Sequence, residues 1–188
     1  GINRSKQQNW RELIEAAMDI AKKAVSGFEG RYIAFDIGPT GRLMAPLGDL
    51  DFEEAVAIYS DNIRLAARLG ADLIIIETMN DCHETKAAVI AAKESCKLPV
   101  IVSNAYDRQG KLMTGASVAA MVAILEGLRV DAFGLNCSFG PDVALEIVDE
   151  FAAVSSTPII AMPNAGLPRV ENGSTVYDVS TEEFSEYM

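Results

Sequence analysis

Cysteine and histidine are scarce in this sequence. Its 188 residues include three cysteines and one histidine. The cysteines form no closely spaced pairs, which argues against a disulfide framework and fits a reducing, cytoplasmic compartment. Because His83 is the only histidine, the sequence offers no Ser-His-Asp set for a hydrolase.

Long hydrophobic runs and an excess of positive charge are also absent. No stretch of about 18 apolar residues occurs, and the first ten residues lack the apolar core of a secretory signal. The 27 acidic residues outnumber the 16 basic ones, which gives a formal net charge of −11. Such a surface repels phosphate backbones. We therefore expect neither a membrane nor a nucleic acid as a partner.

What the sequence does contain is five short runs rich in aliphatic and β-branched residues. Each run is almost continuously hydrophobic instead of alternating, which is typical of strands buried on both faces of a parallel sheet. The predicted strands cover residues 32–36, 73–77, 100–103, 132–136 and 159–162.

Helical patterns alternate with these runs. Apolar residues recur with helical spacing in 10–21 and 52–66. Pro141 suits the first turn of a helix, and Gly70 suits a position just past the end of one. Capping-box spacing, in which an N-cap side chain precedes an acid by three residues, occurs in three places. These places are Asp51/Glu54, Asp81/Glu84 and Ser180/Glu183.

This alternation of strands and helices leaves two architectures open, a doubly wound open sheet and a (β/α)8 barrel. No G-x-G-x-x-G or P-loop motif follows any strand, which weighs against a nucleotide-binding open sheet. A complete barrel takes about 250 residues. We therefore predict an α/β fold that is a partial (β/α)8 TIM barrel of about five βα units over residues 1–188.

A polar or metal-capable residue closes every predicted strand. In a βα barrel, residues just past the carboxyl ends of the strands surround the active site, because the βα loops converge there. This registration predicts a site for a polar ligand at that edge. The strand-end segments are 36–41, 77–79, 103–105, 136–138 and 163–166.

Three strand-end residues stand out as candidates for function. Cys137 is placed to act as a thiolate, although a free cysteine is often a small packed hydrophobe. Glu77 suits an ammonium ligand or a base, although a structural ion pair explains such an acid as well. Asn164 suits hydrogen bonds to a ligand, but turn formation accounts for it almost equally.

Two further features carry less weight. Backbone N–H groups of the Gly38–Gly41 turn suit a carboxylate, although a bare turn is an equal explanation. Cys82 and His83 do not predict a metal site, because neighbouring residues on a new helix turn point in different directions. Cys96 falls late in a helical pattern and is expected to pack.

Four of these segments together resemble the homocysteine S-methyltransferase family, and most of all the homocysteine-binding domain of its cobalamin-dependent methionine synthases. Each segment is weakly specific alone, but the four occur in register and in order along essentially the whole chain. The segments are Asp36-Ile37-Gly38-Pro39-Thr40-Gly41, Ile76-Glu77-Thr78-Met79, Gly134-Leu135-Asn136-Cys137-Ser138 and Pro163-Asn164-Ala165-Gly166.

The resemblance implies that the five strands are the third to the seventh of a barrel, so that its first two strands and its last are missing. It implies that Cys137 is one of three cysteine ligands of a zinc ion, the other two being an adjacent pair beyond Met188. It also implies that Glu77 holds the amino group of homocysteine. The full set of implied substrate-binding residues is Glu77, Asn164, Gly38, Thr40 and Asn136.

The implied activity is zinc-dependent transfer of a methyl group to the thiol of homocysteine, which gives methionine. The implied donor is methylcobalamin, recharged from methyltetrahydrofolate, and both are bound by other domains of the parent protein. With one zinc ligand of three, residues 1–188 alone are expected to be inactive.

Other interpretations remain open at this point. A relative that uses betaine or S-methylmethionine as donor would share the same motifs. A non-catalytic α/β domain that binds a small amino acid would place polar groups similarly, with Cys137 inert. A pterin-binding methyltransferase barrel is a third alternative, although the Asn136-Cys137 segment favours the thiolate–zinc type.

Overall fold

The computed structural model describes residues 9–187 and contains one five-stranded parallel sheet. The strands pair in the order in which they occur along the chain. All five predicted strands are confirmed, with ends displaced by at most two residues. They are β1 (Ala34–Ile37), β2 (Leu73–Met79), β3 (Val100–Asn104), β4 (Ala132–Cys137) and β5 (Ile159–Pro163).

Six helices accompany the sheet within the described residues. They are α1 (Trp10–Val25), α2 (Phe52–Arg68), α3 (Cys82–Ser95), α4 (Val118–Gly127), α5 (Pro141–Val154) and α6 (Thr181–Tyr187). None of these helices is long and apolar enough to cross a bilayer.

All three predicted helix starts are confirmed, and before the sixth helix the Ser180 hydroxyl accepts a hydrogen bond from the Glu183 N–H. The side chains of Asp51 and Asp81 accept hydrogen bonds from the first backbone N–H groups of α2 and α3. The reciprocal bond is not formed in either case, because Glu54 binds Arg42 and Glu84 binds Thr40. These two glutamates therefore connect their helices to the loop that follows β1.

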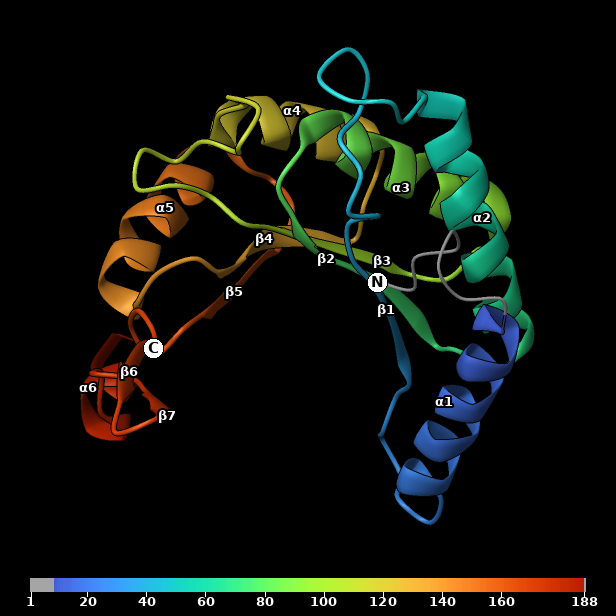
Figure 1. The fold of residues 1–188 in the computed structure, drawn as a ribbon, viewed down its shortest axis with the longest axis horizontal. Coiled ribbons are helices and arrows are strands. Elements are labelled where there is room, and N and C mark those ends of the chain that lie inside the picture. Colours follow the sequence, from blue (N-terminus) through green and yellow to red (C-terminus); the bar gives the residue numbers. More distant parts are fainter. Residues whose placement is uncertain (1–8, 188) are drawn as a thin grey trace.

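The strand order and the placement of the helices decide between the two architectures. A doubly wound sheet reverses its strand order and carries helices on both faces. Here the order runs from β1 to β5 without reversal, and α2 to α5 follow the outer side of a curved sheet (Figure 1). The fold is therefore a partial (β/α)8 barrel, as predicted.

The core lies between the outer face of the sheet and the helices. Ile74, Ile76, Val102 and Phe133 point outward from the strands and are fully buried there, and Phe151 of α5 packs against Phe133. Because side chains alternate along a strand, the residues between them point to the inner, concave face. This inner face carries the polar groups Asp36, Glu77, Ser103 and Asn136.

A short antiparallel hairpin beyond β5 was not predicted. It consists of β6 (Arg169–Glu171) and β7 (Ser174–Val176), joined by Asn172 and Gly173. Both linking residues have positive φ, 50° and 80°, as a two-residue type I′ turn requires. An Asn-Gly pair is a strong hairpin signal, so this element was predictable from the sequence.

We predict that Gly134→Ala strongly destabilises the protein. A Cβ on Gly134 would overlap the backbone oxygen of Ile160 on β5, which cannot move without breaking the sheet. We expect a loss of about 3 kcal/mol or more in the free energy of unfolding, measured by urea denaturation. The matched control is Gly127→Ala at the end of α4, where an added Cβ meets nothing within 4 Å. A loss at Gly134 no larger than at Gly127 would contradict the close packing of β4 on β5.

Candidate functional site

A β-bulge shapes the carboxyl end of β2. The pairing with β3 passes from Ile76 opposite Val102 to Met79 opposite Asn104, so Glu77 and Thr78 together face the single residue Ser103. Thr78 accordingly has a positive φ of 59°. Bulges re-aim side chains and interrupt the ladder. The backbone N–H of Thr78 is thereby available to a side chain.

That side chain is Asn136 at the end of β4, which is 2% exposed. Its Oδ1 accepts hydrogen bonds from the Thr78 N–H at 3.1 Å and the Ser103 hydroxyl at 2.9 Å. Its Nδ2 donates to the Thr78 hydroxyl at 2.6 Å and to the Cys137 sulfur at 3.3 Å. One buried amide therefore connects the ends of β2, β3 and β4.

Cys137 follows directly and is exposed. Cys137 and Ser138 both have positive φ, 54° and 64°, a conformation that costs a non-glycine residue roughly 1–2 kcal/mol. The tight turn is closed by the Phe139 N–H, which donates to the Cys137 carbonyl at 2.8 Å. The Cys137 sulfur is thus at the rim of the sheet and outside the packed core, with one donor fixed beside it.

Asn164 is brought to the same rim by β5. Cys137 pairs with Pro163, and the Asn164 N–H donates to the Phe139 carbonyl at 2.9 Å. Asn164 therefore borders the turn that carries Cys137, and its half-buried side chain remains available for other partners.

The Gly38–Thr40 turn after β1 is held by a buried carboxylate. Glu84, 2% exposed, uses Oε1 to accept hydrogen bonds from the Thr40 N–H and hydroxyl, each at 2.7 Å, and from the Tyr59 hydroxyl at 2.8 Å. A Cβ added to Gly38 would lie 3.6 Å from the Glu77 carbonyl oxygen, so the turn passes close to the bulge of β2. Burial and the neighbouring Glu84 raise the pKa of Tyr59, which stays protonated and donates.

Glu77 has a second carboxyl beside it, that of Asp36. Asp36 pairs with Ile75 across β1 and β2, so Asp36 and Glu77 lie on the same face, close enough for the charge of Asp36 to act on Glu77. Partial burial raises the pKa of both carboxyls, and the charge of Asp36 raises the pKa of Glu77 further. Adjacent carboxyls of this kind share a proton or attract a cation.

Four of the predicted site residues are therefore close to one another along the rim. Glu77, Asn136, Cys137 and Asn164 are connected through the bulge, the Asn136 amide and the Cys137 turn. Gly38 borders Glu77. Thr40 differs, because its hydroxyl and N–H are both directed to Glu84.

Sequence reasoning missed several residues that shape this site. Asp36 and Ser103 occur in the predicted strand-end segments but were assigned no role, although the period of two along each strand places them on the same face as Glu77 and Asn136. Glu84 was interpreted as a capping residue. Its contact with Thr40 spans 44 residues, and no local pattern carries that signal.

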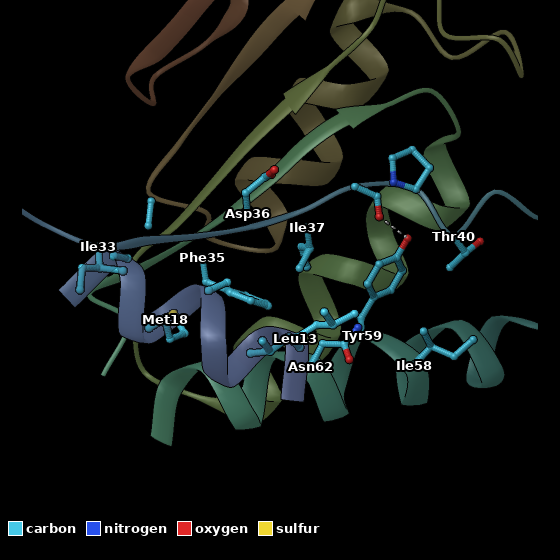
Figure 2. Close-up of a pocket in the computed structure, with 16 residues that line it drawn as sticks. Leu13, Met18, Ile33, Phe35, Asp36, Ile37, Thr40, Ile58, Tyr59 and Asn62 are labelled. Atoms are coloured by element: carbon cyan, nitrogen blue, oxygen red, sulfur yellow. Dashed lines mark hydrogen bonds between the residues drawn. The ribbon is translucent and has the colours of Figure 1, made fainter. Parts of the chain in front are cut away.

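A cavity of about 470 Å³ lies between α1, β1 and α2, and Asp36, Gly38 and Thr40 are among its lining residues. Leu13, Met18, Phe35 and Ile58 give it a mostly apolar lining (Figure 2). It runs beside β1, whose one strand partner among residues 9–187 is β2. An apolar groove offers few partners to an amino acid with two charged groups. The rim that carries Cys137 and Glu77 fits such a ligand better.

The donor set at the rim is incomplete for a metal. Structural and catalytic zinc sites use three or four protein ligands. Within residues 9–187 no group of three histidine, cysteine, aspartate or glutamate side chains is arranged to hold a metal ion. Cys137 is a suitable single ligand, so these residues alone do not fit a zinc site.

Comparison with known proteins places the chain in a family. The profile described as homocysteine S-methyltransferase matches residues 2–188. The chain belongs to this family, as the sequence motifs predicted. Methionine synthase of Mycobacterium leprae (strain TN) is 28% identical over 177 residues, which are 92% of this chain and 15% of that protein. Methionine synthase of Mycobacterium tuberculosis (strain ATCC 25618 / H37Rv) is 28% identical over 187 residues, or 95% and 16%.

Solved structures of the family share the fold. The homocysteine methyltransferase MmuM from Escherichia coli superposes in its apo form with a TM-score of 0.72 at 22% identity, over 84% of this chain and 61% of MmuM. Its metallated form gives a TM-score of 0.70. This family member therefore spans about 15% of the length of the mycobacterial methionine synthases and three fifths of MmuM.

We predict that removing the Glu84 carboxylate loosens the Gly38–Thr40 turn. Glu84→Ala leaves three donors without their acceptor, so we expect the free energy of unfolding to fall by about 3 kcal/mol. Glu84→Gln keeps an oxygen and should lose less. Glu146→Ala on the exposed face of α5 is the control and should change stability by at most about 0.5 kcal/mol. Equal effects of Glu84→Ala and Glu146→Ala in urea denaturation would contradict this assignment.

A second prediction concerns the pH dependence of stability. Because the folded-state pKa values of Asp36 and Glu77 are raised, ionising the pair destabilises the fold as the pH rises above about 4. Asp36→Asn should therefore increase the free energy of unfolding at pH 7, by up to about 1 kcal/mol since the pair is partly solvated. The increase should vanish near pH 3, where both carboxyls are protonated in either state. Thermal or urea unfolding at both pH values measures it, and an equal effect at both would refute the coupling.

Proposed function

We propose that this chain is the homocysteine-binding part of a zinc-dependent methyltransferase that methylates the homocysteine thiol to give methionine. The observation that carries the proposal is the rim of the sheet, where one buried amide connects the Glu77–Thr78 bulge to the exposed thiol of Cys137. Membership of the homocysteine S-methyltransferase family supports this assignment.

In this proposal, each residue of the rim has a distinct task. The Glu77 carboxylate binds the ammonium group of homocysteine, which favours the ionised form of a carboxyl whose pKa is otherwise raised. Asn164, Gly38 and Thr40 line the substrate pocket. Asn136 borders the substrate too, but its Oδ1 and Nδ2 each have two partners within the chain, which favours a positioning role.

Cys137 is proposed as one thiolate ligand of the zinc ion, with the other ligands supplied from outside these 188 residues. When bound, zinc supplies a positive charge that favours the thiolate form of a sulfur ligand at neutral pH. The protein's own contribution is to hold the Cys137 sulfur with a fixed donor at 3.3 Å. Residues 1–188 alone are accordingly proposed to be inactive in methyl transfer.

The methyl donor is proposed to be methylcobalamin, recharged from methyltetrahydrofolate, on other domains of a larger cytoplasmic protein. The two mycobacterial methionine synthases, of which this chain matches only a small share, support this choice. Betaine or S-methylmethionine would be the donor in the alternative branch. The two alternatives predict different results in one assay. Cobalamin should stimulate methyl transfer by the gene product if methylcobalamin is the donor, and should have no effect if betaine or S-methylmethionine is.

The test is zinc analysis of the purified gene product that carries these residues. We expect about one zinc per polypeptide, and a loss of at least about tenfold in affinity on Cys137→Ser. Cys96→Ser is the matched control, because Cys96 lies at the end of α3 with its sulfur near the Ala92 carbonyl. Homocysteine-dependent methyl transfer should fall with the zinc. Full zinc occupancy in Cys137→Ser would support a non-catalytic binding domain and overturn the proposal.

A further inference from the structure

Asp36 is the last inner-face residue of β1, and it begins the Asp36–Gly41 family segment without a role in the proposed function. Figure 2 shows its side chain projecting from β1 on the side opposite Phe35 and Ile37, away from α1 and α2. Its carboxyl is thus turned to the concave face on which the substrate is proposed to bind.

The geometry joins Asp36 to Glu77. Asp36 is in register with Ile75, and Glu77 follows two residues later on the same face, so the two side chains are diagonal neighbours across a parallel pair. The bulge after Ile76 turns Glu77 at the rim, next to the Gly38 turn that continues β1.

This pair lacks a cation of its own within the part of the chain that the structure describes. No lysine, arginine or histidine among residues 9–187 forms an ion pair with either carboxyl. The inner-face neighbours on β3 are Ile101 and Ser103, which are uncharged. Burial is the largest cause of the raised pKa of both carboxyls, and the charge of Asp36 raises the pKa of Glu77 further.

A primary ammonium group matches this arrangement better than a metal ion. An ammonium group has three N–H donors and one positive charge, so it can bridge two carboxylates on neighbouring strands. A metal ion would need further ligands, and no third metal-capable side chain joins the pair among residues 9–187.

We propose that Asp36 and Glu77 together bind the α-ammonium group of homocysteine, which makes Asp36 a specificity-determining residue. This inference rests on the proposed function. It extends that function by defining the substrate class as thiols that carry an unsubstituted α-amino group. A thiol acid without the amino group leaves both carboxyls unpaired and is rejected for that reason.

The test compares two ligands that differ only in the amino group, homocysteine and 4-mercaptobutyrate, by calorimetry on the gene product at pH 7. We expect the wild type to prefer homocysteine and Asp36→Asn to weaken homocysteine binding about tenfold, as expected for a charge-assisted hydrogen bond. Binding of 4-mercaptobutyrate should be unchanged, so the preference collapses. Asp36→Glu keeps the carboxylate and should retain the preference.

The control is Asp19→Asn on the exposed surface of α1, which removes the same charge away from the site. It should change neither affinity. A merely structural role of Asp36 would weaken both ligands alike and leave the preference intact, which would overturn the inference.

The failure of this inference is distinguishable from that of the proposed function. Homocysteine binding with an undiminished preference in Asp36→Asn refutes the role of Asp36 alone and leaves Glu77 and Cys137 in place. A wild-type protein that binds neither thiol refutes the proposed function, and the role of Asp36 with it.

Discussion

The arrangement of the site depends on one buried amide, that of Asn136. Its four hydrogen bonds use the backbone N–H that the bulge of β2 withdraws from the ladder, two hydroxyl groups and the Cys137 sulfur. An unpaired amide at this depth costs several kcal/mol, so the four bonds form together or the strand ends separate. This constraint fixes the position of Glu77 relative to Cys137. Asn136 binds Thr78, the residue after Glu77, and it also binds the sulfur of Cys137.

The two faces of the sheet have different roles, because the outer face stabilises the fold and the inner face carries the polar groups of the site. The outer face contributes large apolar side chains to a core shared with α2 to α5, whereas the inner face carries carboxyl, hydroxyl and amide groups near the carboxyl ends of the strands. Parallel strands bring these ends to one rim, so Thr78 and Asn136, which are 58 positions apart in the chain, become neighbours. The positive φ values of Thr78, Cys137 and Ser138 occur at this rim. Strained backbone of this kind is typical of functional sites.

The fold was largely readable from the sequence, because hydrophobic periodicity and helix caps are local signals. The continuous apolar runs gave the five strands, and chain length and the missing glycine motifs pointed to part of a barrel. The Asn172–Gly173 hairpin was missed through an overlooked signal, not through an absent one. The site was predictable only in part. Strand-end motifs identified Glu77, Asn136, Cys137 and Asn164, but no local pattern reveals that Glu84 binds Thr40 or that Asp36 contacts Glu77, since both contacts are made across the fold.

The central claim is that the rim orients homocysteine with its amino group at the carboxyl pair and its sulfur toward Cys137. Anomalous diffraction at the zinc edge from crystals of the gene product with homocysteine tests it most directly. The account predicts an anomalous peak about 2.3 Å from the Cys137 sulfur, with the substrate nitrogen between Asp36 and Glu77. A metal bound without Cys137, or a substrate nitrogen remote from both carboxyls, would contradict it.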